Sequence, residues 1–143
     1  MDVAIEIVRA KGHENVRCFH KSTLEVTRED HLTPRGDCII GVAADKAAAT
    51  LSPEVKDVLR DDRAKVILLL YCDGALDIIV ARGSSKLVLS DEKRIIVRRS
   101  SYIEPATIAI NADKAARDIN RDLVRKLRSG GAELLVIIVA VRP

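Results

Sequence analysis

Three histidines and one short turn are the residues of this chain whose types best suit binding chemistry. All three histidines lie in the first half, and the turn Thr33–Asp37 places Arg35 and Asp37 on either side of a glycine. A guanidinium group binds an anion through paired N–H groups, and an imidazole titrates near neutral pH. We therefore expect a pocket for a small anionic ligand beside this turn. The residues predicted to form it are His20, His31, Arg35, Asp37, Asp45 and Lys46.

The turn Thr33–Asp37 also has a purely structural interpretation. Its proline and glycine stand where a tight turn favours them, and Arg35 and Asp37 can pair with each other. The sequence leaves both interpretations open.

A metal site is not expected. Cys18 and His20 are two residues apart in a predicted strand and would face the same side, and zinc accepts thiolate and imidazole ligands. However, the chain has no CxxC or HxxxH spacing. If a metal were bound, His20, His31 and Asp37 would be the first ligand candidates.

The dipeptide Asp-Lys occurs twice, each time before a predicted helix. Asp45 and Asp113 are expected to cap these helices, because a carboxylate accepts the free N–H groups of a first turn. Lys46 and Lys114 would then be solvated. The alternative is that both helix starts meet in one composite anion pocket.

The same dipeptides belong to an internal repeat, which predicts the architecture. Ala44–Ala48 recurs letter for letter as Ala112–Ala116, and the flanking segments match at an offset of 68 residues, or 71 upstream of the turn at Thr33. Such self-similarity indicates a duplicated structural unit. We predict a single domain over 1–143, made of β-β-β-α-β units at about 3–72 and 75–141.

Alternating and apolar runs predict the strands, and two amphipathic segments predict the helices. The first helix follows Asp45 and is interrupted at Ser52-Pro53; the second runs from Asp113 to about Arg128. The predicted strands are Val3–Ala10, Val16–Thr27, Asp37–Ala43, Lys65–Cys72, Ala75–Ala81, Lys86–Leu89, Arg94–Val97, Thr107–Ile110 and Glu133–Val141.

These elements predict a fold that is mainly β with two helices, α+β by content. Asp73-Gly74 predicts a hairpin between two long strands, and the repeat then places the N-terminal strand beside the C-terminal strand. Such pairing hides sheet edges that one half alone would expose. The units would form a sandwich with pseudo-two-fold symmetry, or alternatively a closed barrel.

Composition indicates the cellular compartment in which the protein is expected. Hydrophobic residues make up 48% of the chain and charged residues 31%, and no apolar run is long enough to span a bilayer. The N-terminus does not resemble a signal peptide, and three cysteines suggest free thiols in a reducing compartment. We expect a cytoplasmic protein without a membrane partner, with a composition that resembles that of thermophile proteins.

Several stretches resemble the archaeal family catalogued as domain of unknown function 371. They are His31–Val42, Ala44–Ala47, Gly12–Arg17 and Asn111–Ala115. The resemblance implies an archaeal origin and a fold similar to a β-sandwich of jelly-roll type, and it brings no activity, cofactor or catalytic residue. Family members usually have Ala-Thr-His where this chain has Cys18–His20. This departure weakens Cys18 as a ligand candidate and leaves His20 as the better one.

Three classes of function remain open. The first is a protein that binds a small anionic ligand at the turn in the first half. The second is a nucleic-acid or ribonucleoprotein accessory factor acting through the basic second half, although the net charge is only +3 and aromatic residues for base stacking are few. The third is a structural or oligomer-forming protein without a pocket. The sequence decides neither whether the protein is an enzyme nor its oligomeric state, and it identifies no cofactor.

Overall fold

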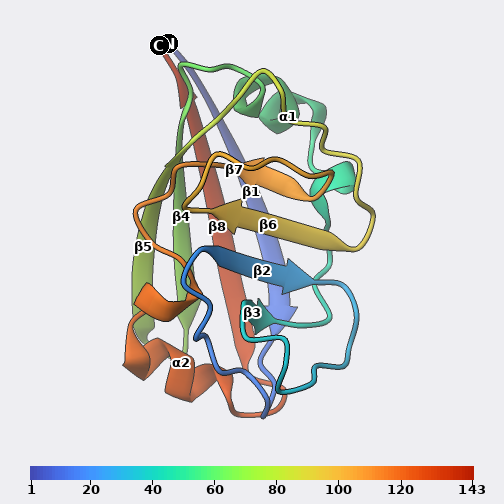
Figure 1. The fold of residues 1–143 in the computed structure, drawn as a ribbon, viewed down its shortest axis with the longest axis vertical. Coiled ribbons are helices and arrows are strands. Elements are labelled where there is room, and N and C mark those ends of the chain that lie inside the picture. Colours follow the sequence, from blue (N-terminus) through green and yellow to red (C-terminus); the bar gives the residue numbers. More distant parts are fainter.

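Two four-stranded sheets, with a short helix at each end of the molecule, make up the fold (Figure 1). The computed structural model describes all residues from 1 to 143. The elements are β1 (Asp2–Lys11), β2 (Thr23–Thr27), β3 (Ile39–Gly41), the 3-10 turn η1 (Ala48–Thr50), α1 (Pro53–Leu59), β4 (Lys65–Cys72), β5 (Ala75–Arg82), β6 (Arg94–Arg98), β7 (Thr107–Ala109), η2 (Ala116–Asp118), α2 (Arg121–Leu127) and β8 (Glu133–Arg142).

The larger sheet has the order β1-β8-β4-β5 and is antiparallel throughout. Asp73 and Gly74 both have positive φ angles and form the tight hairpin between β4 and β5, as predicted. The predicted pairing of the terminal strands is also confirmed. Val3 lies opposite Val141, and both chain ends meet at the top of Figure 1.

The smaller sheet has the order β3-β2-β6-β7. The central strands β2 and β6 are antiparallel, whereas the edge strands β3 and β7 run parallel to their neighbours. These strands run across those of the larger sheet (Figure 1). Because the two sheets are separate, the closed-barrel alternative is wrong. The parallel pairs also distinguish this arrangement from a jelly roll, in which strands pair antiparallel.

The facing sides of the sheets and helices share one apolar core, because strand side chains alternate between the two faces. A single cluster of 40 buried residues draws on both sheets and both helices. Its large, fully buried members include Leu24, Leu59, Leu68, Leu70, Ile79, Ile108, Leu123 and Leu127.

Several predicted boundaries are corrected. Only Thr23–Thr27 of the predicted strand 16–27 is extended and paired, because Cys18 adopts a φ of 57° that interrupts a strand. The predicted strand 86–89 is absent, and Leu89 has a φ of 54°. The break at Ser52-Pro53 is confirmed, since the Ser52 hydroxyl caps α1 by accepting the Val55 N–H.

The second helix is also shorter than predicted. Only the 3-10 turn η2 lies between Asp113 and Asn120, and the Asn120 side chain caps α2 by accepting the Asp122 N–H. A break of the same kind therefore precedes both helices, although only the first half carries a proline there.

Positions matched by the sequence repeat share unusual backbone geometry. Cys18 and Leu89 have positive φ angles, and so do Ala43 and Asn111. Matched residues also pair with each other across strands: Glu25 lies opposite Ile96, and Leu69 lies opposite Ile137.

The C-terminal parts of both edge strands of the larger sheet, β1 and β5, are covered by chain segments that follow β3 and β7. Lys11 on β1 exchanges backbone hydrogen bonds with Val42, and Arg82 on β5 does so with Ile110. These contacts occupy edge N–H and C=O groups that another strand would otherwise pair with.

Candidate functional site

The predicted site residues do not form one pocket. His31 and Arg35 are exposed, and Asp37 is half-buried on the same connection between β2 and β3. Asp45 and Lys46 lie instead against β1, at an edge of the larger sheet. The expected neighbourhood therefore separates into two regions.

His20 organises the chain immediately before β2. Its Nδ1 accepts hydrogen bonds from the backbone N–H groups of Ser22 at 3.2 Å and Thr23 at 3.0 Å. Because Nδ1 accepts these bonds, the imidazole acts locally as a turn cap. The His20 N–H also donates to the Asp37 carbonyl at 3.3 Å, so these two residues are neighbours. The structure contains no group of three His, Cys, Asp or Glu side chains placed to hold one metal ion, so His31 does not join them in a metal site.

The two Asp-Lys dipeptides have a role that neither sequence interpretation anticipated. The carboxylates of Asp45 and Asp113 accept strand N–H groups, from Arg9 and Val80 respectively, each at 3.0 Å. The predicted helix caps are therefore wrong. The donors lie on β1 and β5, which are opposite edges of the larger sheet, so the two motifs do not line a shared pocket.

Lys46 and Lys114 are likewise bonded to the protein, although their side chains remain 31% and 33% exposed. The Lys46 ammonium donates to a Glu6 carboxylate oxygen at 2.8 Å, and that of Lys114 donates to Asp77 at 2.5 Å. Burial alone would raise the pKa of each carboxyl group. The lysine and backbone hydrogen bonds outweigh burial, so the pKa values of Glu6 and Asp77 are lowered.

A cavity of about 180 Å³ lies beside the turn Thr33–Asp37, where the sequence predicted a pocket. Its lining includes His31 but neither Arg35 nor Asp37. Two carboxylates, Glu25 and Glu29, dominate its charge. The complete lining is Glu25, Thr27, Glu29, His31, Leu32, Thr33, Gly36 and Ile39.

Glu25 is the most unusual side chain of this cavity. It lies in the middle of β2, is only 8% exposed, and its one hydrogen-bond contact is a weak one from the Cys38 thiol, with Sγ 3.9 Å from Oε1. Burial raises the pKa of Glu25, and the nearby Glu104 and Asp91 raise it further, while Arg94 opposes them. A buried carboxylate without a strong partner is costly to the folded state.

Cys38 reaches Glu25 because the connection from β2 to β3 folds back over β2. Burial, together with the charges of Glu25 and Asp37, raises the pKa of the Cys38 thiol to about 12. The thiol therefore stays protonated at neutral pH and acts as a weak donor rather than a nucleophile.

In the basic second half, the arginines of β6 and the one that follows it are largely paired within the chain. Arg94 pairs with Asp91 at 3.0 Å, Arg98 with Glu104 at 2.9 Å, and Arg99 contacts Asp118 at 3.4 Å. Tyr102 covers the Arg98 guanidinium, 4.9 Å from the ring centre. Little of this charge is left free to meet an external polyanion.

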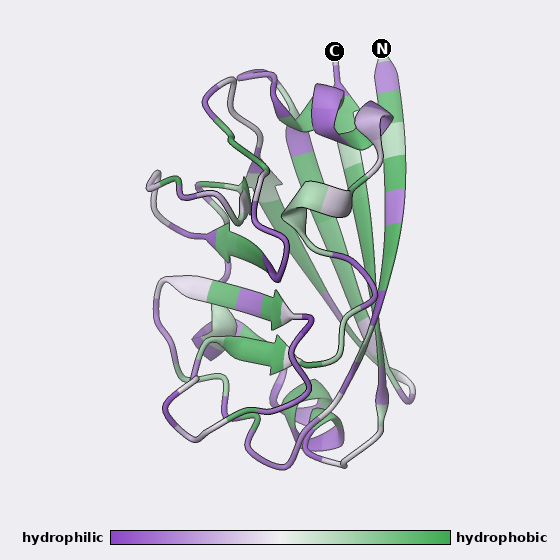
Figure 2. Ribbon diagram, turned by 90° about the vertical axis from the view of Figure 1, so that its right-hand side faces the viewer, coloured by the Kyte–Doolittle hydropathy of each residue, from purple (hydrophilic) through white to green (hydrophobic).

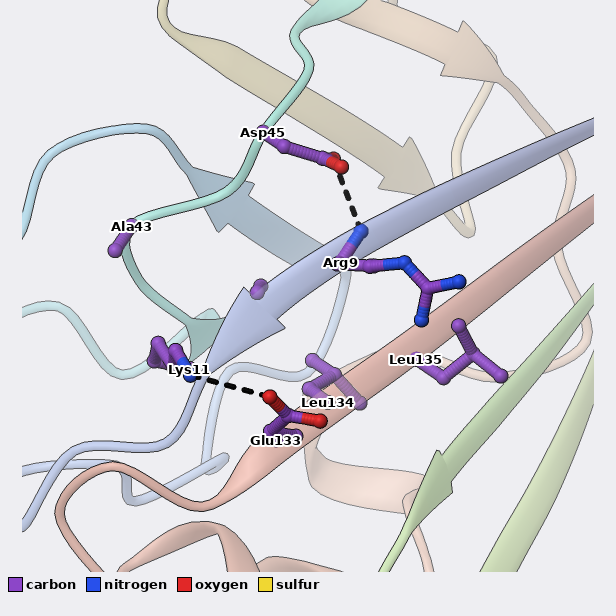
Figure 3. A pocket seen from close by; sticks show the side chains of 8 residues that line it. Arg9, Lys11, Ala43, Asp45, Glu133, Leu134 and Leu135 are labelled. Carbon is purple, nitrogen blue, oxygen red and sulfur yellow. Dashed lines mark hydrogen bonds and ion pairs between the residues drawn. The ribbon is translucent and has the colours of Figure 1, made fainter.

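A second cavity, of about 290 Å³, lies beside Asp45 at the end of β1 (Figure 3). Figure 3 shows Asp45 bonded to the Arg9 backbone, and the Arg9 guanidinium extending over β8 towards Leu135. Lys11 and Glu133 form an exposed ion pair at its margin, with N and O 3.3 Å apart. Charged side chains of both signs line this cavity, so its charge favours neither an anion nor a cation.

Comparison with known proteins shows the family of this chain. Residues 8–141 match the family described as domain of unknown function 371. The chain belongs to that family. It is also 46% identical over 133 residues to an uncharacterized protein of the archaeon Methanocaldococcus jannaschii, covering 93% of this chain and 98% of the relative. No helix has the length and apolar character needed to cross a membrane.

The sequence analysis did not single out Glu25, which lines the cavity beside the turn. Its signal was present, because the repeat aligns Glu25 with Ile96, so a carboxylate occupies a strand position that is apolar in the other half. A charged residue inside a buried strand, without a matched partner, is a functional candidate on physical grounds.

Proposed function

We propose that the protein binds a small cationic ligand, carrying an ammonium group, in the cavity beside the turn Thr33–Asp37. The observation that carries this proposal is the buried Glu25 carboxylate, which lines the cavity and has only a thiol as its partner. An ammonium group would supply the charged hydrogen bonds that this carboxylate lacks, and it would add to the opposite charge of the nearby Arg94.

The rest of the lining agrees with such a ligand. Glu29 brings a second carboxylate, whose Oε2 lies 3.2 Å from Nε2 of His31. Two threonines add hydroxyl groups, and Leu32 and Ile39 provide apolar walls. A volume of about 180 Å³ suits a group of a few non-hydrogen atoms rather than a nucleotide. This charge reverses the anionic ligand expected from Arg35, which does not line the cavity.

The binding test uses methylammonium chloride titrated by calorimetry or NMR, with sodium phosphate as the anionic alternative. We expect Glu25→Gln to weaken methylammonium binding at least about 10-fold, because the charged partner of a buried hydrogen bond is removed. Glu54→Gln, at an exposed helix carboxylate, serves as the control and keeps the wild-type affinity. Phosphate binding that is lost in Arg35→Ala would contradict the proposal and favour the anion.

The affinity should also depend on pH. A cation binds only the charged form of Glu25, and the pKa of that group is raised in the free protein. Methylammonium affinity therefore increases as the pH rises through the Glu25 pKa, and Glu25→Gln abolishes this dependence. A pH-independent affinity in the wild-type protein would place the ligand elsewhere.

Glu25→Leu should stabilise the protein while removing the site. Leucine is similar in size, and it avoids burying a carboxylate among apolar neighbours. The free energy of unfolding, measured in urea at pH 7, should rise by about 1–2 kcal/mol. Because folding raises the pKa of Glu25, the charged carboxylate destabilises the folded protein at neutral pH. As the pH falls, the carboxyl group becomes protonated and this cost disappears, so the gain from leucine should be smaller near pH 4. A loss of stability would show that Glu25 has a structural role.

We also infer that the two halves are copies of one β-β-β-α-β unit. The shared positive φ angles, the paired Asp-Lys contacts and the cross-strand pairing of matched residues all support this inference. Glu25, Cys38 and the longer turn differ between the copies, which favours a function specific to the first half.

A further inference from the structure

The outer face of the larger sheet is apolar and bears no covering element. Figure 2 shows the smaller sheet and both helices on one side of it only. Seven of its side chains are 37–59% exposed: Val3, Ile5, Ile7, Tyr71, Leu76, Ile78 and Val80. Six more are half-buried between them: Ile67, Leu69, Leu135, Ile137, Val139 and Val141. These thirteen residues form the outer face.

The strand register makes the outer face continuous. One row across the four strands reads Ile7, Ile137, Leu69 and Ile78, and the adjacent row reads Ile5, Val139, Ile67 and Val80. Both rows are free of charge. An antiparallel sheet that faces water normally alternates apolar and polar residues, with the polar ones outside.

We propose that the outer face is the interface of a homodimer, in which two copies of this chain pack their larger sheets face to face. With roughly 200 Å² for a fully exposed large side chain, the outer face leaves on the order of 800 Å² of largely apolar surface in water. Monomers rarely expose contiguous apolar patches above roughly 600 Å². An interface of standard size buries roughly 800 Å² on each partner.

Partial covering of the sheet edges favours the face as the route of association. Residues following β3 and β7 already bond to β1 and β5, so two copies cannot extend the sheet edge to edge at those positions. A two-fold dimer uses the same patch on both subunits, and the outer face is apolar enough to be its own complement.

The charges at the margin favour aligned rather than crossed strands. Lys65 and Arg82 lie together at one corner of the sheet, and Arg9 lies near the diagonally opposite corner, where the charge of Lys11 is offset by Glu133. A two-fold axis along a diagonal would place basic corners on basic corners. An axis along or across the strands places each basic corner over one without basic side chains, and aligned packing is a common geometry for stacked sheets.

The test is sedimentation velocity of the full chain from about 1 to 100 μM. We expect a species of twice the chain mass, and Ile7→Lys should raise its dissociation constant at least about 100-fold by placing a charge in the interface. Val88→Lys is the matched control, since Val88 is similarly exposed but lies outside the sheet, and it should leave the dimer intact.

Two further measurements keep the proposal falsifiable. Ile78→Lys repeats the test on the opposite edge strand, and circular dichroism verifies that each variant keeps its sheets. In the wild-type protein, the fluorescence of an apolar dye per chain should rise on dilution as the outer face becomes exposed. A wild-type monomer throughout this range, including one that binds lipid vesicles, overturns the proposal. So does a dimer that folded Ile7→Lys and Ile78→Lys leave unchanged.

Discussion

Replacing Gly83 by alanine lowers the free energy of unfolding by more than about 3 kcal/mol. The new Cβ atom would stand 2.4 Å from the Leu59 carbonyl oxygen and 2.9 Å from that of Asp61. Both atoms are backbone, at the end of α1, and cannot move aside as a flexible side chain would. Gly12→Ala should act in the same way, because its Cβ would lie 2.2 Å from the Leu127 carbonyl oxygen.

Gly130→Ala is the control for this pair. A Cβ at Gly130 meets nothing within 4 Å, so we expect its unfolding free energy in urea to stay within about 0.5 kcal/mol of wild type. Equal midpoints for Gly83→Ala and Gly130→Ala would show that α1 does not approach the end of β5 as closely as the structure has it.

The residues that follow these two glycines connect the halves of the chain through hydrogen bonds. Ser84, after β5, donates its N–H to Leu59 at the end of α1, while His13, after β1, donates to Leu127 at the end of α2. Each bond satisfies a carbonyl that a helix end leaves free. Because β1 bonds to the helix of the second half and β5 to that of the first, neither half completes its hydrogen bonding alone.

The sequence predicted the long strands because their patterns are strong and their partners are local or implied by the repeat. The hairpin at Asp73-Gly74 needs only turn chemistry, and the pairing of β1 with β8 follows from the pairing of β5 with β4. Edge strands β3 and β7 have three residues each, which is too short for a pattern of alternation. Their parallel pairing could therefore not be predicted from the sequence.

The segment 16–22 shows where alternation misleads. Its pattern is that of a strand, but Arg121 on α2 donates to the Cys18 carbonyl at 3.1 Å, and Cys18 adopts a positive φ. This contact spans about a hundred residues, so local sequence cannot reveal it. The same limit applies to Asp45, whose partner is the distant Arg9 backbone rather than the nearby helix.

A cavity lies beside the turn where the sequence predicted a pocket, but its lining differs from the predicted residues. Proline, glycine and the extra residues marked the turn at Thr33 as a place where the halves differ, and a cavity lies beside it. Arg35 drew attention because guanidinium groups bind anions, yet its side chain is exposed and does not line the cavity. Glu25 was missed because burial, rather than residue type, makes its carboxylate unusual.

The second large effect is expected at Asp77, whose carboxylate joins three parts of the chain. It accepts hydrogen bonds from Lys114 at 2.5 Å and from the Asn120 backbone at 2.7 Å, just before α2. Asp77→Ala should cost about 3 kcal/mol, the lower end for breaking a buried ion pair, since the Lys114 side chain is 33% exposed and can still reach water. Glu6→Ala should cost a similar amount, because Glu6 binds Lys46 and the Ser52 N–H in the same way.

Acid should remove this contribution in a defined window. Hydrogen bonds from Lys114 and the backbone outweigh burial and lower the pKa of Asp77 in the folded state. Its stabilising effect is therefore complete above the unfolded-state pKa of about 3.9, and it is lost as the pH falls through the lower, folded-state pKa. The difference in unfolding free energy between wild type and Asp77→Asn should stay constant from about pH 7 to 5 and shrink below about pH 4. Glu133→Gln, in the exposed pair with Lys11, should change stability by less than about 1 kcal/mol throughout. The stability difference between wild type and Asp77→Asn could instead persist undiminished at low pH. In that case the hydrogen bonds to the start of α2, rather than the ion pair with Lys114, stabilise this junction.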